Sequence, residues 1–69
     1  VIVLDIMMPG ISGFDTLRRL QSLPEMPPVI IYSQAEKSMA IQALSLGAKF
    51  FLPKPQKPEI LIQKVMEFL

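Results

Sequence analysis

The sequence predicts an α/β fold in which strands and helices alternate in the order βαβαβα around a parallel sheet. Three short apolar runs, at residues 1–4, 29–33 and 48–52, lack polar alternation, which is typical of strands buried on both faces. Segments with apolar residues at helical spacing follow each run. Strands that are separated by helices favour right-handed crossovers and therefore a parallel sheet.

Composition narrows the class of protein further. The 69 residues are 51% hydrophobic and 19% charged, which predicts one small folded domain without disorder. The sequence has no cysteine or histidine, which excludes disulfides, thiol chemistry, histidine acid–base catalysis and the common zinc sites. A net charge of +1 gives no reason to expect nucleic-acid contact, and no apolar run is long enough to span a membrane. The absence of cysteine is compatible with the cytoplasmic location that we predict.

The first strand runs directly into Asp5, and residues 6–10 are expected to form a loop because proline and glycine end the strand. Ser12 is a plausible cap for the next helix, with Asp15 in a capping-box arrangement. The spacing predicts an apolar stripe on this helix and a charged outer side. The stripe comprises Phe14, Leu17, Leu20 and Leu23, and the outer side Arg18, Arg19 and Gln21. The proline-rich residues 23–28 then form a loop.

The second strand ends in Ser33, and a helix capped by Ser38 is expected to reach Leu46, where Gly47 stops it. Its predicted buried side consists of Ala40, Ile41, Ala43 and Leu44. The third strand leads into Pro53-Lys54-Pro55, a rigid turn that displays one ammonium group. Pro58 suits the first position of the last helix. The predicted inner face of that helix is Leu61, Ile62, Val65, Phe68 and Leu69.

Asp5, Ser33 and Lys54 each stand at or just past the carboxyl end of a predicted strand. Parallel strands end at one edge of the sheet, so a carboxylate, a hydroxyl and an ammonium are expected to converge there. Taken alone, each residue has an ordinary explanation. The aspartate could form a turn, the serine could hydrogen-bond to nearby backbone, and the lysine could be a solvated surface charge. Together they suit phosphoryl transfer to a carboxylate nucleophile, a reaction that needs a divalent cation because both reactants are anionic.

Three motifs also carry a family resemblance. They are Asp-Ile-Met-Met-Pro-Gly-Ile-Ser-Gly over residues 5–13, Val-Ile-Ile-Tyr-Ser over residues 29–33, and Gly-Ala-Lys-Phe-Phe-Leu-Pro-Lys-Pro over residues 47–55. In this order they resemble the CheY-like receiver domain of response regulators in two-component signalling. The resemblance implies the βαβαβα portion of a flavodoxin-like, doubly wound parallel sheet. It covers residues 1–69 as the last three βα units of the family's five.

The resemblance implies a role for each site residue. Asp5 would accept a phosphoryl group from a histidine kinase or phosphotransfer protein, and the Met7 backbone carbonyl would join Asp5 as a Mg²⁺ ligand. Ser33 matches the switch hydroxyl, and Lys54 matches the lysine that contacts the phosphoryl group. Phe51 matches the aromatic switch.

Two further features concern the third motif. The resemblance implies a cis peptide bond between Lys54 and Pro55, which proline tolerates. Strand alternation allows only one of Phe50 and Phe51 on the switch side, and either could instead be a core residue.

The family's first strand, first helix and second strand have no counterpart in the sequence. The acidic pair that supplies most Mg²⁺ ligands is missing with them, so residues 1–69 alone are expected to bind Mg²⁺ poorly. Their absence would leave residues 1–4 as an exposed apolar edge, which predicts a marginal or self-associating fragment, and a dimer is one form of this. A downstream effector domain or protein is the expected partner that reads the switch.

An aspartate at the end of a parallel strand also suggests two other functions. A haloacid-dehalogenase-type phosphatase also uses an aspartate after a parallel strand, but it needs a second aspartate where this sequence has Met7. A receiver-like interaction scaffold that takes no phosphoryl group is the alternative to a phosphoacceptor. The prediction is therefore a signalling domain and not an enzyme that turns over substrate.

Overall fold

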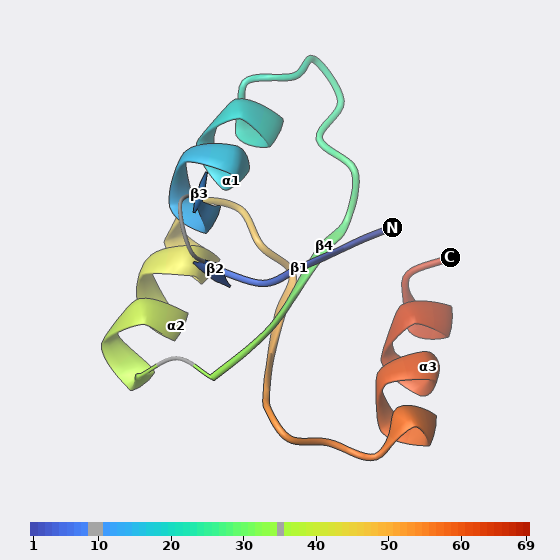
Figure 1. Cartoon of the computed structure of the whole chain (residues 1–69). Helices are drawn as coiled ribbons and strands as arrows, with labels where there is room; N and C mark the ends of the chain where they lie inside the picture. Colours follow the sequence, from blue (N-terminus) through green and yellow to red (C-terminus); the bar gives the residue numbers. More distant parts are fainter. Residues whose placement is uncertain (9–10, 35) are drawn as a thin grey trace.

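The computed structural model describes residues 1–8, 11–34 and 36–69 and contains a parallel sheet with three helices (Figure 1). The sheet strands are β1 (Ile2–Leu4), β4 (Val29–Ser33) and β5 (Phe50–Pro53). The helices are α1 (Gly13–Gln21), α2 (Lys37–Ser45) and α3 (Pro58–Glu67). No helix in the described part of the chain is long and apolar enough to cross a membrane.

The three sheet strands are parallel and lie in the order β1-β4-β5. Leu4 pairs with Ile31, and Ile31 pairs with Phe51, so side chains at these positions share one face. Figure 1 shows α1 and α2 on one side of the sheet and α3 on the other. The predicted fold class, a portion of a doubly wound parallel sheet, is therefore confirmed.

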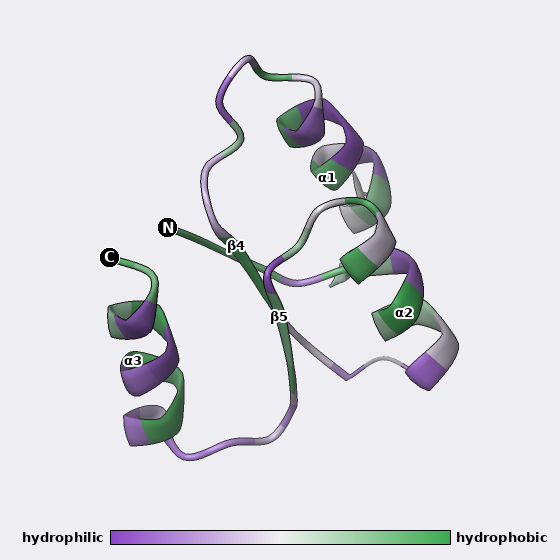
Figure 2. Cartoon of the chain, turned by 180° about the vertical axis from the view of Figure 1, so that it is seen from behind, coloured by the Kyte–Doolittle hydropathy of each residue, from purple (hydrophilic) through white to green (hydrophobic). Residues whose placement is uncertain are grey.

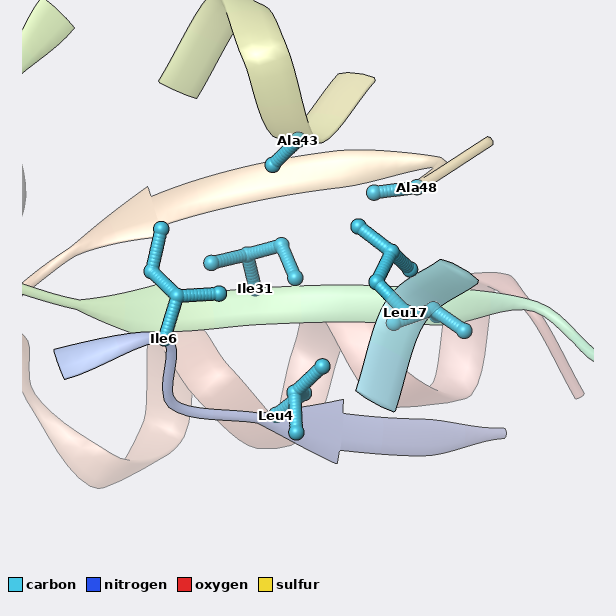
Figure 3. Packing of buried hydrophobic residues seen from close by; sticks show 7 residues of the cluster. Leu4, Ile6, Leu17, Ile31, Ala43 and Ala48 are labelled. Atoms are coloured by element: carbon cyan, nitrogen blue, oxygen red, sulfur yellow. The ribbon is translucent and has the colours of Figure 1, made fainter. Parts of the chain in front are cut away.

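The core lies between the sheet and helices α1 and α2 (Figure 3). Its members without solvent exposure come from β4 and from the sides of α1 and α2 that face the sheet. The full cluster is Leu4, Ile6, Leu17, Val29, Ile31, Ala43 and Ala48. Figure 2 shows the same bias, because most of β4 and β5 is hydrophobic whereas α1 is largely polar on its outer side.

Gly13 begins α1 in direct contact with the segment that follows Asp5. A Cβ atom at Gly13 would lie 2.3 Å from the Cα of Ile6, so no larger residue fits without moving the backbone. Ile6 itself is buried in the core. This close approach holds the segment just after Asp5 against the start of α1 and explains why the first motif contains glycine at this position.

Several predicted boundaries differ from the structure. The expected loop after Asp5 contains a short antiparallel hairpin of β2 (Met7–Met8) and β3 (Ile11–Ser12), whose turn at residues 9–10 lies outside the described part. Helix α2 begins before Ser38, because the carbonyl of Glu36 accepts hydrogen bonds from the amides of Met39 and Ala40. The cap by the Ser12 side chain also lies outside the described part and stays a prediction.

The ends of the helices follow the sequence more closely. Gly47 has a φ of 103°, a conformation that favours glycine and ends α2 as predicted. Pro58 begins α3, also as predicted. The third strand is Phe50–Pro53 and so starts two residues later than expected.

The predicted buried faces of the helices are only partly correct. Leu17 is fully buried, but Leu23 lies beyond α1 and is exposed. On α2, Ala43 is buried, whereas Ile41 and Leu44 face solvent. Helix α3 has no fully buried residue. Of the predicted inner face, Leu61, Val65 and Phe68 are half-buried, whereas Ile62 and Leu69 are exposed. Phe68 and Leu69 lie beyond the end of α3 at Glu67.

The first strand is an edge strand. Leu4 is buried, but Val3 is 44% exposed, so the prediction of burial on both faces is wrong for β1. It holds for β4, where Val29, Ile30 and Ile31 are inaccessible to solvent. The free edge of β1 agrees with the exposed apolar edge that was expected. Whether it causes self-association stays a prediction.

The burial pattern gives a matched pair of substitutions. Leu17→Ala removes a fully buried side chain and should lower the free energy of unfolding by about 2–5 kcal/mol. Leu44→Ala makes the same change at a side chain that is 44% exposed and should cost no more than about 0.5 kcal/mol. Urea denaturation of the intact protein measures both, and equal losses would contradict the packing described for α1.

Candidate functional site

Three side chains meet at the carboxyl edge of the sheet. Asp5 follows β1, Ser33 ends β4 and Lys54 follows β5. The Ser33 hydroxyl donates a hydrogen bond to Oδ1 of Asp5 at 2.7 Å, and the Lys54 ammonium donates to Oδ2 at 2.8 Å. The predicted convergence of these three residues therefore appears in the structure, and the Lys54–Pro55 bond is cis as expected.

A fourth donor comes from the backbone. The amide N–H of Met7 donates to Oδ1 of Asp5 at 2.8 Å, which closes a tight turn just past the strand. The family resemblance implies a role for the carbonyl of Met7, but nothing in the sequence predicts this contact of its amide. Both carboxylate oxygens of Asp5 thus accept hydrogen bonds, and Oδ1 accepts two.

These donors stabilise the ionised form of Asp5. They lower its pKa from 3.8 to about 2, with the Lys54 hydrogen bond as the largest cause, followed by Met7 and Ser33. Partial burial opposes the shift but does not cancel it. Asp5 is consequently an anion at neutral pH, which is the form a carboxylate needs to act as a nucleophile.

Ser33 is the buried polar member of the site. Its side chain is inaccessible to solvent, and a buried hydroxyl without a partner would cost about 1–3 kcal/mol. The bond to Asp5 removes that cost. Asp5 and Lys54 remain partly open, with side chains 29% and 34% exposed, so a small anion can approach the carboxylate from solvent.

The pairing of β4 with β5 decides which of Phe50 and Phe51 lies on the same face of the sheet as Ser33, a question that the sequence left open. Phe51 pairs with Ile31 and packs against the core on the α1 and α2 side, the face that Ser33 shares with Ile31 by alternation. Phe50 pairs with Ile30 and lies on the α3 side, with the Lys64 ammonium 4.5 Å from its ring centroid. Phe51 is thus on the side that a switch coupled to Ser33 requires.

Tyr32 is a neighbour of the site that the sequence analysis did not single out. Its hydroxyl is hydrogen-bonded to the backbone of Gln56, and the Lys54 ammonium lies 5.2 Å from its ring centroid. The alternation of side chains along β4 could have predicted that Tyr32 lies on the face opposite to Ser33, although not which residues it contacts.

The described residues do not make up a complete magnesium site. Within residues 1–8, 11–34 and 36–69 there is no group of three acidic, histidine or cysteine side chains that could hold a metal. Mg²⁺ prefers one or two carboxylates with waters and phosphate oxygens. Asp5 and the Met7 carbonyl can therefore supply only part of such a set.

The fold and the site together define a CheY-like α/β domain with an aspartate–serine–lysine cluster at the carboxyl edge of its sheet. The family model for the response regulator receiver domain matches residues 1–66. The chain belongs to this family, the receiver domains of two-component systems.

Curated relatives share this segment. The chain is 44% identical over 61 residues to a protein-glutamate methylesterase/protein-glutamine glutaminase of Clostridium acetobutylicum, with 84% of the chain covered. It is 35% identical over 69 residues to Protein PetR of Rhodobacter capsulatus, with the whole chain covered. The chain spans 18% and 29% of the length of these two relatives.

Solved receiver domains have the same fold. The BeF3-activated DrrB receiver domain is 30% identical, with a TM-score of 0.85 over 96% of this chain and 57% of that one. A CheY-like receiver domain protein from Methanospirillum hungatei is 26% identical, with a TM-score of 0.84 over 94% of this chain and 53% of that one. The Mn²⁺-bound form of response regulator Rcp1, at 20% identity and a TM-score of 0.71, shows the fold alone.

The lowered pKa of Asp5 predicts a pH dependence. Because folding lowers this pKa, Asp5 stabilises the folded state above pH 3.8, and that contribution is lost as the pH falls toward about 2. Lys54→Met removes the largest cause, so the pKa of Asp5 should rise toward 3.8 and much of the acid-dependent loss of stability should disappear. A ¹³C NMR titration of the carboxyl carbon, without divalent cations, measures the pKa.

Lys64→Met is the matched control, since Lys64 pairs with Glu67 on α3 and does not contact Asp5. It should leave the pKa of Asp5 at about 2. An unchanged value in Lys54→Met as well would show that the ion pair is not what lowers the pKa.

Proposed function

We propose that Asp5 accepts a phosphoryl group and that the domain uses this modification as a signalling switch. The observation that carries the proposal is the ionised Asp5 carboxylate, partly open to solvent, with a hydroxyl and an ammonium within 2.8 Å. Both donors can serve phosphoryl oxygens as readily as carboxylate oxygens. Membership of the receiver family supports the same function.

In the proposed step a carboxylate oxygen of Asp5 attacks the phosphorus of a phosphohistidine on the partner. The new O–P bond forms as the N–P bond breaks, and the bonding electrons return to the imidazole nitrogen, which takes up a proton. The lysine and serine of the site place positive and hydrogen-bonding groups where negative charge collects. The product is an aspartyl phosphate on Asp5.

Phosphorylation of Asp5 would give the Ser33 hydroxyl and the Lys54 ammonium new hydrogen-bond acceptors. The modification adds about −1.5 to −2 charge and three acceptor oxygens, so both donors are drawn from the carboxylate to the phosphoryl group. Ser33 is buried, and its displacement opens space on the face where Phe51 packs. Phe51 would then act as the aromatic switch, biasing α2 and β5 toward a second packing that a partner reads.

We further propose that residues 1–69 form part of a larger receiver domain whose acidic Mg²⁺ ligands lie outside them. Asp5 and the carbonyl of Met7 would contribute two ligands of that site. The bound ion would offset charge between the carboxylate and the incoming phosphoryl group.

The partners follow from this chemistry. A histidine kinase or phosphotransfer protein would supply the phosphoryl group, and an effector domain or protein would respond to the switch. The proposed location is the cytoplasm, and the proposed role is signalling without turnover of a substrate.

The test is intact-mass analysis of the full-length protein after incubation with Mg²⁺ and acetyl phosphate. Wild type should gain the mass of one phosphoryl group, with acetate as the leaving group, and Asp5→Asn should gain none because it lacks the nucleophile. Asp15→Asn is the matched control, since Asp15 is on the surface of α1 and pairs with Arg18, and it should be labelled like wild type.

Labelling of Asp5→Asn would place the acceptor elsewhere and contradict the proposal. A folded wild-type protein that stays unlabelled by both acetyl phosphate and a phosphorylated kinase would leave the interaction scaffold as the function.

A further inference from the structure

Tyr32 lies next to the site but on the other face of the sheet. It precedes Ser33 in β4 and pairs with Leu52 of β5, so alternation directs its side chain toward the α3 side. The ring is half-buried at the end of the strand. The segment that carries Lys54 leaves the sheet beside it, between β5 and α3.

The Tyr32 hydroxyl holds the backbone just beyond Lys54. It accepts a hydrogen bond from the amide of Gln56 at 3.2 Å and is 3.5 Å from the Gln56 carbonyl, to which it can donate. The Lys54 amide donates to the Ser33 carbonyl at 3.1 Å. Two successive residues of β4 therefore restrain both ends of residues 54–56.

The Tyr32 ring also faces the charge of Lys54. The ammonium is 5.2 Å from the ring centroid and 2.8 Å from Oδ2 of Asp5, so it lies between an aromatic face and the carboxylate. An ammonium within about 6 Å of a tyrosine ring is attracted to it. This attraction does not depend on whether Asp5 carries a phosphoryl group.

A second contact of this kind limits the motion of the Lys54 side chain. A lysine side chain has four rotatable bonds and loses considerable rotamer freedom when its charge is held in one place. If the carboxylate were its sole partner, no other contact would keep the ammonium in place while an incoming phosphoryl group competes for Oδ2 of Asp5. A second contact keeps it near the position that the phosphoryl oxygens will occupy.

The geometry points to Tyr32 as a positioning residue that holds Lys54 at the phosphoacceptor site, through its ring and through its hydroxyl bond to Gln56. This inference rests on the proposed function. It assigns Tyr32 no contact with the phosphoryl group itself, because the ring is on the opposite face from Ser33.

Phe50 provides a matched control on the same face. Its ring faces the Lys64 ammonium at 4.5 Å, which is the same kind of contact, but neither residue bonds to the site. Loss of an aromatic ring on the α3 side is thus common to Tyr32→Leu and Phe50→Leu. Loss of the contact to Lys54 is specific to Tyr32→Leu.

The experiment compares Tyr32→Leu, Tyr32→Phe and Phe50→Leu in the full-length protein. ¹⁵N relaxation of the Lys54 ammonium reports its order, and intact mass reports the rate of labelling by acetyl phosphate with Mg²⁺. Tyr32→Leu should make the ammonium more mobile and slow labelling roughly three- to tenfold. Tyr32→Phe keeps the ring and should recover part of both, and Phe50→Leu should match wild type.

Each outcome bears on one claim. Unchanged order and rate in Tyr32→Leu, or equal changes in Phe50→Leu, would overturn the positioning role. If Tyr32→Leu does not fold, Tyr32→Phe becomes the test. It removes the hydrogen bond to Gln56, so the Lys54 ammonium should still become more mobile. An ammonium as ordered as in wild type would refute the role of the Tyr32 hydroxyl. A wild-type protein without labelling would refute the phosphoacceptor function, while the relaxation data would still test the contact between Tyr32 and Lys54.

Discussion

The hydrogen bonds to the Asp5 carboxylate are the interaction on which the rest of the site depends. They come from the hairpin, from β4 and from the segment after β5, so a single anion ties together the ends of all three strands. Without the negative charge, the buried hydroxyl of Ser33 and the ammonium of Lys54 would lose their common partner. The donors in turn lower the pKa of Asp5 and so keep its carboxylate ionised.

The two faces of the sheet differ in how tightly the residues around the Asp5 carboxylate are packed. Ser33 and Phe51 share the face covered by α1 and α2, where Ser33 is fully buried and Phe51 packs partly buried against the core. A displacement of Ser33 must therefore be accommodated by repacking of its neighbours. Tyr32 and Phe50 share the face covered by α3, where the packing is looser and two lysines contact aromatic rings. The alternation of adjacent residues in β4 therefore connects one site to two differently packed surfaces.

The fold and the three strand-end residues could be predicted because they depend on local patterns. Apolar runs set the strands, Gly47 and Pro58 mark helix ends, and parallel topology brings Asp5, Ser33 and Lys54 to one edge. The contacts of Met7 and Tyr32 could not be predicted, since they depend on how the backbone turns after each strand. The exposed Ile62 and Leu44 were misassigned because helical spacing identifies an apolar face but not how much of it other elements cover.

The central claim is that Ser33 and Lys54 move from the Asp5 carboxylate to a group attached to it. A crystal structure of the full-length protein with Mg²⁺ and trifluoroberyllate, a tetrahedral stand-in for a phosphoryl group, tests this directly. We expect beryllium bonded to a carboxylate oxygen of Asp5, with the Lys54 ammonium and the Ser33 hydroxyl hydrogen-bonded to fluorides. Beryllium bound away from Asp5, or a Lys54 ammonium still on the carboxylate of modified Asp5, would contradict the account.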